Sequence, residues 1–200
     1  MIAIVDYGAG NLFSVANALE HLSISYQITQ EPQALYESDG VLLPGVGAFP
    51  DAMAMLREKD LIPILRQMAK KKPFLGICLG MPVLFCQGEE FCLTKGLGLL
   101  KGQVKKMNPP GLKIPHMGWN QLNIMKDDPL FSGLPEKAWM YFVHSYFVHA
   151  LQRDQVLAQV DYGVPMDVAV RKGSLWAVQF HPEKSGETGL ALLKNFASMK

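Results

Sequence analysis

A cysteine between two glycines is the strongest candidate for chemistry in this sequence. Cys78 follows the apolar run Pro73–Leu75, with Gly76 and Gly80 two positions away on either side. The run predicts a buried parallel strand, and the glycines predict a nucleophile elbow that turns sharply into a following helix. An elbow holds its reactive residue in a strained conformation close to neighbouring strands, so a Cβ at either glycine would be crowded. A thiol at a helix N-terminus has a lowered pKa, which makes Cys78 a candidate nucleophile; the alternative is a buried structural cysteine.

The second candidate is a histidine and a glutamate at the end of a predicted strand. Pro182 favours an extended conformation at His181, and residues two apart on an extended chain project to the same side. The side chains of His181 and Glu183 can therefore interact. An imidazole oriented by a carboxylate is the base that a nucleophilic thiol requires. The alternative interpretation is a polar turn that ends the strand.

A glycine-rich loop supplies the third candidate feature, since Pro44-Gly45-Val46-Gly47 follows another predicted strand. Elbow enzymes take one oxyanion-hole N–H from a neighbouring loop and another from the residue after the nucleophile. The backbone N–H groups of Val46 and Leu79 are the corresponding candidates here. One such donor stabilises the transition state by about 3 kcal/mol. An ordinary Pro-Gly turn is the alternative interpretation of the loop.

Short apolar strands alternate with helices through the first half of the chain. Strands are predicted at 1–5, 24–29 and 40–43 and before Cys78, and helices at 12–22, 51–59 and 61–71. The alternation predicts an α/β fold of three layers, in which helices cover both faces of a mostly parallel sheet. The three candidate features all lie at predicted strand C-termini, where open α/β sheets bind ligands.

Period-two patterning replaces this alternation after Leu99. It predicts strands at 102–107, 121–125, 139–144 and 156–160, then a hairpin with strands 166–170 and 176–180 around a turn at 172–174, and a last helix at 189–199. We therefore expect additional antiparallel strands in the second half of the chain. The chain length of 200 residues predicts a single domain over residues 1–200.

Composition and charge exclude several classes of protein. A hydrophobic fraction of 49% with 18% charged residues is that of a globular domain, and a net charge of +1 with scattered basic residues argues against a nucleic-acid surface. No signal peptide and no apolar run of membrane length is present, so we expect a cytoplasmic protein. Gly8-x-Gly10 has Phe13 where a dinucleotide-binding fingerprint requires its third glycine, which favours a tight strand-to-helix turn. The three cysteines lack the paired spacing of a disulfide framework or a zinc site.

These motifs together resemble those of a known enzyme family. Gly76-x-Cys78-x-Gly80 with His181-Pro182-Glu183 is similar to the pattern of class I, triad-type glutamine amidotransferases. Over essentially the whole chain, the sequence resembles the glutaminase subunits of imidazole glycerol phosphate synthases. The stretches that carry this second resemblance are 6–11, 43–49, 115–120, 141–146 and 179–185.

The resemblance implies a glutaminase that needs neither a cofactor nor a metal. Cys78 would attack the side-chain amide of glutamine, with His181 as base and then acid, and Glu183 would orient the imidazole. A γ-glutamyl thioester would form as ammonia leaves, and water would then release glutamate. The remaining roles fall to Val46 and Leu79 as oxyanion donors and to Gly47, Ser145 and Tyr146 as contacts for the backbone end of the substrate.

The resemblance also implies a partner. Family members form a heterodimer with a (βα)8-barrel synthase, which uses the ammonia to make imidazole glycerol phosphate and an aminoimidazole carboxamide ribotide in histidine biosynthesis. Free ammonia in neutral water is largely protonated, so a sealed route between the subunits has a physical purpose. Positions at or near this interface correspond to Asn11, Met117, Trp119, Tyr141 and Lys184. Without the resemblance, Met117 and Trp119 would be interpreted as core residues and Tyr141 as an ordinary strand aromatic.

The sequence departs from the family pattern at one important position. The family has Cys-x-Gly-x-Gln, and Pro82 stands here in place of the glutamine. Proline is tolerated in the first turn of a helix, so we expect the fold to survive. The missing amide would cost a substrate hydrogen bond of about 1.5–3 kcal/mol. Two alternatives therefore remain beside the active glutaminase: a relative that feeds a different synthase, such as a sugar amidination enzyme, and a glutaminase-poor structural or regulatory subunit.

Overall fold

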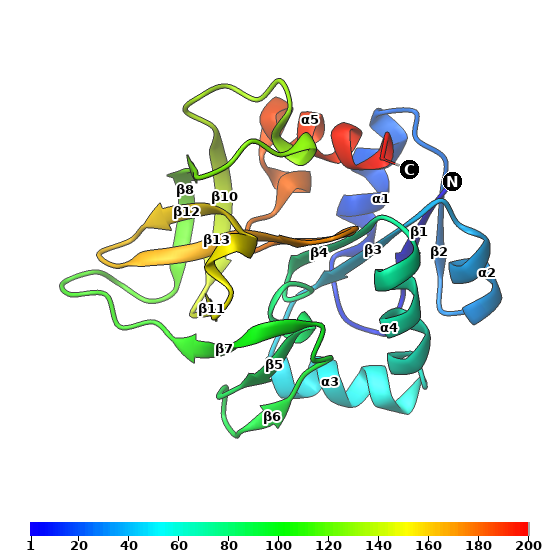
Figure 1. The fold of residues 1–200 in the computed structure, drawn as a ribbon, viewed down its shortest axis with the longest axis horizontal. Helices are drawn as coiled ribbons and strands as arrows, with labels where there is room; N and C mark the ends of the chain where they lie inside the picture. Colours follow the sequence, from blue (N-terminus) through cyan, green and yellow to red (C-terminus); the bar gives the residue numbers. More distant parts are fainter. Residues whose placement is uncertain (200) are drawn as a thin grey trace.

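A mostly parallel set of strands forms the middle layer of the molecule (Figure 1). The computed structural model describes residues 1–199. Five neighbouring strands lie in the order β2-β1-β3-β4-β14, and all four of their pairings are parallel. Their carboxyl ends therefore meet at one edge of the sheet. The bounds are β1 Ile2–Val5, β2 Tyr26–Thr29, β3 Gly40–Gly45, β4 Phe74–Cys78 and β14 Leu175–Val178.

Antiparallel strands extend this sheet beyond β14 and form a second, smaller sheet. The large sheet continues in the order β13-β11-β7-β5-β6, with β12 paired to β13 and to β9, while β8 and β10 pair only with each other. The last hairpin, β13 and β14, returns the chain to the parallel region next to β4. The bounds are β5 Phe85–Gly88, β6 Thr94–Lys95, β7 Leu100–Lys106, β8 His116–Gln121, β9 Asn123–Ile124, β10 Trp139–His144, β11 Tyr146–Ala150, β12 Val156–Asp161 and β13 Pro165–Lys172.

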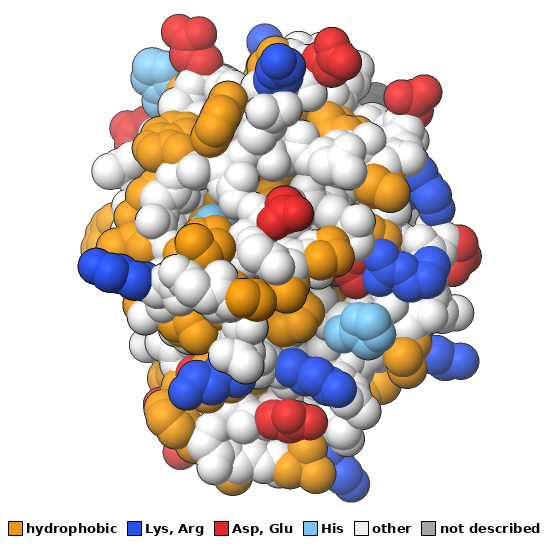
Figure 2. Space-filling view, turned by 90° about the vertical axis from the view of Figure 1, so that its left-hand side faces the viewer, with side chains coloured by type: hydrophobic (Ala, Val, Ile, Leu, Met, Phe, Trp, Pro, Cys, Tyr) orange, Lys and Arg blue, Asp and Glu red, His pale blue; other side chains and the backbone are white. Residues whose placement is uncertain are grey.

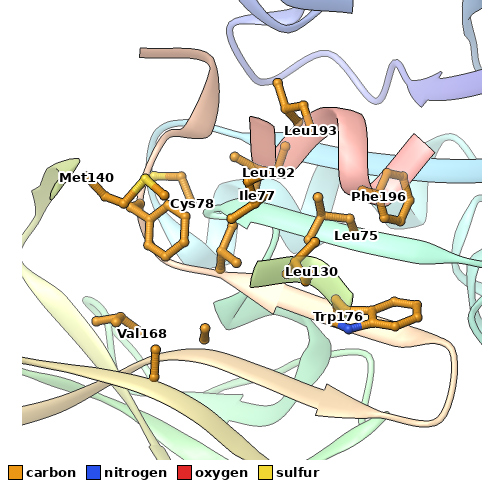
Figure 3. Packing of buried hydrophobic residues seen from close by; sticks show 14 of the residues in the cluster. Leu75, Ile77, Cys78, Leu130, Met140, Val168, Trp176, Leu192, Leu193 and Phe196 are labelled. Carbon is orange, nitrogen blue, oxygen red and sulfur yellow. The ribbon is translucent and has the colours of Figure 1, made fainter. Parts of the chain in front are cut away.

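Helices cover both faces of the parallel strands and complete three layers (Figure 1). On β1, Ile2 and Ile4 pack with α1 and α5, whereas Ala3 and Val5 belong to the core shared with α2, α3 and α4. Figure 3 shows this packing on β4, where Leu75 and Ile77 lie beside side chains of α5. Among residues 1–199, no helix is both long and apolar enough to cross a membrane. The helices are α1 Leu12–His21, α2 Pro32–Glu37, α3 Phe49–Glu58, α4 Ile62–Lys71 and α5 Gly186–Ala197.

The predicted fold class is confirmed, and most predicted elements lie within three residues of the observed ones. The predicted strand 121–125 is confirmed only in part, because it contains just the two-residue β9 and the last residue of β8, and the main strand there, β8, begins five residues earlier. The pattern also failed to predict α2, β5, β6 and β11.

The helix expected after Cys78 is replaced by a 3-10 turn, Pro82–Leu84, that leads directly into β5. Two long-range hydrogen bonds explain the difference: the N–H of Leu97 donates to the carbonyl of Val83 at 2.7 Å, and that of Leu99 to the carbonyl of Leu84 at 2.9 Å. A longer helix would need those carbonyls for its own hydrogen bonds.

Candidate active site

Cys78 is the last residue of β4 and has a left-handed backbone conformation, with φ of 53°. Such a conformation is unfavourable for a side chain larger than glycine, and it is typical of a strained functional turn. The two glycines explain how the turn fits. A Cβ at Gly76 would lie 2.6 Å from the carbonyl oxygen of Gly80, and one at Gly80 would collide with the carbonyl oxygen of Leu43 on β3. The local geometry is therefore that of the predicted elbow.

One part of the elbow argument must be corrected. Because only a three-residue 3-10 turn follows Cys78, there is no α-helix whose macrodipole could act on the thiol. Pro82 is the first residue of that turn, where its missing N–H leaves no hydrogen bond unmade. The charged form of His181 interacts with the Cys78 side chain instead.

His181 and Glu183 are in the contact that their spacing predicts. His181 is extended, with φ of −102° and ψ of 93°, and its Nδ1 lies 2.7 Å from Oε1 of Glu183. Both side chains are 2% exposed. A carboxylate in this place fixes the proton on Nδ1 and leaves Nε2 for chemistry. The Nε2 atom is buried and forms no hydrogen bond with residues 1–199.

The charge state of His181 depends on both neighbours. Burial lowers the pKa of His181, but interactions with Cys78 and Glu183 outweigh the burial and raise it to about 9. At neutral pH the imidazole is therefore charged, with a proton on Nδ1 toward Glu183 and a second proton on Nε2. A proton held there is available to a leaving group on the Cys78 side.

Ser185 holds the backbone of His181 in place and was not singled out from the sequence. Its hydroxyl donates to the carbonyl of His181 at 2.6 Å and accepts the N–H of Tyr141 at 2.9 Å, and the N–H of His181 donates to the carbonyl of Tyr141. These bonds join the turn after β14 to strand β10. A buried serine four residues after the histidine is the only signal in the sequence, and it is too common to have been informative.

A cavity of about 280 Å³ opens beside Cys78 and His181. It brings together residues from the loop after β3, the end of β4, the turn after β14 and the junction of β10 and β11. Glu183 does not line it and lies behind His181. The sequence-predicted residues that line it are Val46, Gly47, Cys78, Leu79, Pro82, Ser145, Tyr146 and His181.

Among residues 1–199, Glu90 is the only carboxylate that lines this cavity, and the sequence analysis missed it. Its Oε2 accepts the N–H of Phe49, the first residue of α3, at 2.7 Å. A helix N-terminus stabilises a negative charge, so Glu90 presents a fixed carboxylate to the cavity. Such a group suits the ammonium of an amino acid. Among residues 1–199, no group of three or more His, Cys, Asp or Glu side chains is placed to hold a metal ion.

The two candidate oxyanion donors do not both point into the site. The N–H of Leu79 donates to the carbonyl of Gly45 at 3.3 Å, as one more hydrogen bond of the β3–β4 ladder. In a trans peptide the carbonyl and the following N–H point in opposite directions, so the N–H of Val46 points away from Leu79. An oxyanion at this place requires the Gly45–Val46 peptide to rotate.

The five residues predicted at a partner interface are on or near the surface. Met117 and Trp119 on β8 are 62% and 52% exposed, which contradicts the alternative that they pack in the core. Lys184 is exposed, and the half-buried Tyr141 has its ring 6.2 Å from that of Trp119. Asn11 caps α1, since its Oδ1 accepts the N–H of Ser14. Figure 2 shows the side of the molecule toward which β8 lies, where hydrophobic side chains gather in the middle and most charged ones lie toward the rim.

Comparisons with known proteins show the family to which the chain belongs. The family described as glutamine amidotransferase class-I matches residues 3–199. The chain is 51% identical over 197 residues to imidazole glycerol phosphate synthase subunit HisH of Desulfitobacterium hafniense, covering 98% of this chain and 93% of that one. The same subunit of Moorella thermoacetica is 46% identical over 199 residues, covering 99% and 94%. A solved glutamine amidotransferase is similar in fold, with a TM-score of 0.76 at 21% identity over 98% and 99% of the two chains. The chain therefore belongs to the class-I glutamine amidotransferase family.

Proposed function

We propose that this chain is the glutaminase subunit of an imidazole glycerol phosphate synthase. In this proposal it hydrolyses the side-chain amide of glutamine and passes the ammonia to a partner that builds the imidazole ring. The observation that supports it most is the line from Glu183 through His181 toward Cys78, which ends in a cavity with a fixed carboxylate. The names of the relatives supply the acceptor pathway, which the cavity itself does not contain.

The chemistry follows from the positions of the sulfur and the imidazole. The Sγ of Cys78, whose proton is taken by Nε2 of His181, attacks the amide carbon, and the carbonyl oxygen takes the negative charge. As the C–N bond breaks, Nε2 of His181 gives its proton to the nitrogen, which leaves as ammonia. Water then attacks the thioester, His181 takes its proton, and the C–S bond breaks to release glutamate. Glu183 accepts the Nδ1 proton in a hydrogen bond throughout and stabilises the imidazolium.

Substrate recognition is assigned to the polar rim of the cavity. Gly47, Ser145 and Tyr146 offer backbone and hydroxyl groups for the α-carboxylate, and Glu90 offers a carboxylate for the α-ammonium. Pro82 lines the same cavity without any polar side-chain atom. In this proposal the absent amide weakens glutamine binding, whereas the catalytic residues keep their places.

The partner in this proposal is a (βα)8-barrel synthase bound as a heterodimer in the cytoplasm. The exposed Met117 and Trp119, with Asn11, Tyr141 and Lys184, form the docking surface. Ammonia released against a sealed interface stays unprotonated and nucleophilic. A different acceptor enzyme is not favoured, because the curated relatives at 46–51% identity all carry the same subunit name.

A direct test measures two activities of the complex with the barrel synthase. Cys78→Ala is expected to abolish glutamine-dependent synthesis and to leave ammonia-dependent synthesis intact, because the nucleophile is needed only to make ammonia. His181→Ala is expected to behave in the same way, and Glu183→Gln to be less severe because it orients rather than transfers a proton.

Two outcomes contradict the proposal. Unchanged glutamine-dependent turnover in Cys78→Ala would show that the nucleophile is misassigned. A wild-type complex that uses ammonia but never glutamine would instead identify the chain as a structural subunit, the role that Pro82 left open.

A further inference from the structure

Two buried histidines that are separate from the Glu183–His181 pair lie at the junction between the small and the large sheet. His144 ends β10 and His116 begins β8, and the two residues are directly paired across these antiparallel strands. Both are buried, at 8% and 3% exposure, and His144 also lines the catalytic cavity. The mechanism described above uses neither of them.

The hydrogen bonds around His144 define a turn. Only Ser145 separates β10 of the small sheet from β11 of the large sheet, so the chain changes sheets at this residue. Nδ1 of His144 lies 2.8 Å from the carbonyl oxygen of Tyr146, which bridges the crossing. The carbonyl of Ser145 in turn accepts the N–H of Met107 just beyond β7. The crossing is the segment assigned above to the α-carboxylate of glutamine.

His144, His116 and Asn120 are hydrogen-bonded in series, and the groups at the two ends of the series show which ring nitrogens carry protons. The carbonyl of Tyr146 only accepts, so Nδ1 of His144 carries a proton, and in a neutral ring Nε2 is then an acceptor. It lies 3.0 Å from Nδ1 of His116, which therefore donates. Nε2 of His116 accepts from Nδ2 of Asn120 at 3.3 Å, and the same amide donates to the carbonyl of Asp161 at 2.9 Å. Every ring nitrogen has one partner when both rings are neutral.

Two further observations support a neutral, fixed pair. Burial lowers the pKa of His116 and of His144 to about 4 in each case, so both rings are uncharged at neutral pH. The ring of His116 is stacked on two aromatic rings, with centroids 4.8 Å from that of Phe142 and 4.1 Å from that of Tyr162. These contacts fix the orientation of the imidazole, and with it the direction in which Nδ1 donates.

We propose that His144, oriented by His116, is a positioning residue that holds the Ser145–Tyr146 crossing in the shape that binds glutamine. The inference rests on the proposed function, because it assigns this crossing to the substrate. The Ser145 carbonyl has its partner in Met107, and Tyr146 is paired with Lys106 of β7, so the imidazole adds a donor from β10 for the Tyr146 carbonyl and ties the crossing to the small sheet. His116 and Asn120 extend the support to β8 and β12.

Three substitutions at position 144 separate positioning from general stability. His144→Asn places an amide nitrogen near the position of Nδ1 and keeps the donor to Tyr146. His144→Gln places its amide near Nε2 and loses that donor, and His144→Phe keeps a ring without any donor. With the barrel synthase bound, Phe and Gln are expected to raise the KM for glutamine by about tenfold to a hundredfold, because the Tyr146 carbonyl loses its donor, with a smaller change in kcat. Asn is expected to recover most of the loss.

The comparison of Asn with Gln keeps the test valid if Phe fails to fold. Equal KM values for the Asn and Gln variants, both folded, would overturn the proposal, as would a Phe variant with wild-type KM. Calorimetric titration of glutamine into Cys78→Ala, with and without His144→Gln, is expected to show the same weakening without catalysis. Nitrogen chemical shifts of the imidazoles are expected to place the His144 proton on Nδ1 at neutral pH, and a proton on Nε2 alone would refute the bonding scheme.

A failure of the proposed function gives a different result. If the wild-type complex does not hydrolyse glutamine and Cys78→Ala does not bind it, the substrate assignment is wrong. If the wild type binds and hydrolyses glutamine but the variants at 144 match it, only the positioning role is wrong.

Discussion

The Gly45–Val46 peptide is not oriented to stabilise an oxyanion at the candidate site. Its carbonyl accepts the N–H of Leu79 at 3.3 Å, so one donor is occupied and the Val46 N–H points the other way. Val46→Pro removes the second donor permanently, since proline has no N–H. Val46 is 41% exposed, so the loss of its side chain alone costs little packing.

The expected magnitude has two parts. Rotation of the peptide breaks one ladder hydrogen bond, a net cost of about 0.5–1.5 kcal/mol, which a bound partner could offset. Loss of an oxyanion donor costs about a hundredfold to a thousandfold in kcat. We therefore expect slow glutamine hydrolysis by the isolated wild type, stimulation by the barrel synthase, and a complex of Val46→Pro that is slower than the wild-type complex by that larger factor.

The assay compares steady-state glutaminase rates with and without the synthase at saturating acceptor ligand. Val46→Ala, which keeps the N–H, is the matched control and should respond to the synthase as the wild type does. Ammonia-dependent synthesis should be the same in all three complexes, which shows that the subunits still assemble. Wild-type glutaminase rates in the Val46→Pro complex would refute the donor assignment, and equal rates with and without the synthase would refute the rotation.

Other consequences of the site can be measured in the same complex. Pro82→Gln is expected to lower the KM for glutamine by about tenfold to a hundredfold with a smaller change in kcat, and to change stability by no more than about 0.4–1 kcal/mol through the unfolded chain; an unchanged KM would mean that another group makes the contact. Glu90→Gln is expected to raise that KM by at least about tenfold while ammonia-dependent synthesis continues, and an unchanged KM would exclude the ammonium contact. Because Cys78 and Glu183 raise the pKa of His181 to about 9 against burial, its contribution to the free energy of unfolding is fully present below pH 6.5 and is lost as pH rises through 9. Unfolding of the wild type should therefore show a loss over this range that His181→Gln lacks, and identical pH profiles would contradict it.

The geometry around Cys78, His181 and Glu183 was predictable because its determinants are local. Cys78 is set by glycines two residues away, and His181 and Glu183 by their spacing around a proline. The convergence of the two motifs required only that their strands be parallel neighbours, and β4 and β14 are paired in that way. The conformations that such local sequence patterns favour are also found in the folded protein, because tertiary contacts do not oppose them.

The missed features depend on contacts that are distant in sequence. Glu90 is fixed by the N–H of Phe49, 41 residues earlier, and its own segment has no periodicity. The helix after the elbow is prevented by hydrogen bonds from Leu97 and Leu99. On β8 the apolar side chains of Met117 and Trp119 face outward, which reverses the usual alternation of buried apolar and exposed polar residues. A prediction that expects the apolar residues to be buried therefore places the strand too late in the chain. An inverted pattern is what a surface covered by a partner would produce.

The position of Pro82 explains why a proline here is compatible with the observed arrangement of Cys78, His181 and Glu183. Cys78 is placed by β4, and His181 by β14 and by the hydrogen bonds of Ser185. None of these contacts involves Pro82. Pro82 is the first residue of the 3-10 turn after the elbow, a position where a backbone N–H would have no hydrogen-bond partner within the turn. Proline in place of the glutamine that the resemblance implies therefore leaves this part of the cavity wall without a polar side chain and does not move the sulfur or the imidazole. The effect of Pro82 should accordingly appear in glutamine affinity and not in the rate of the chemical step.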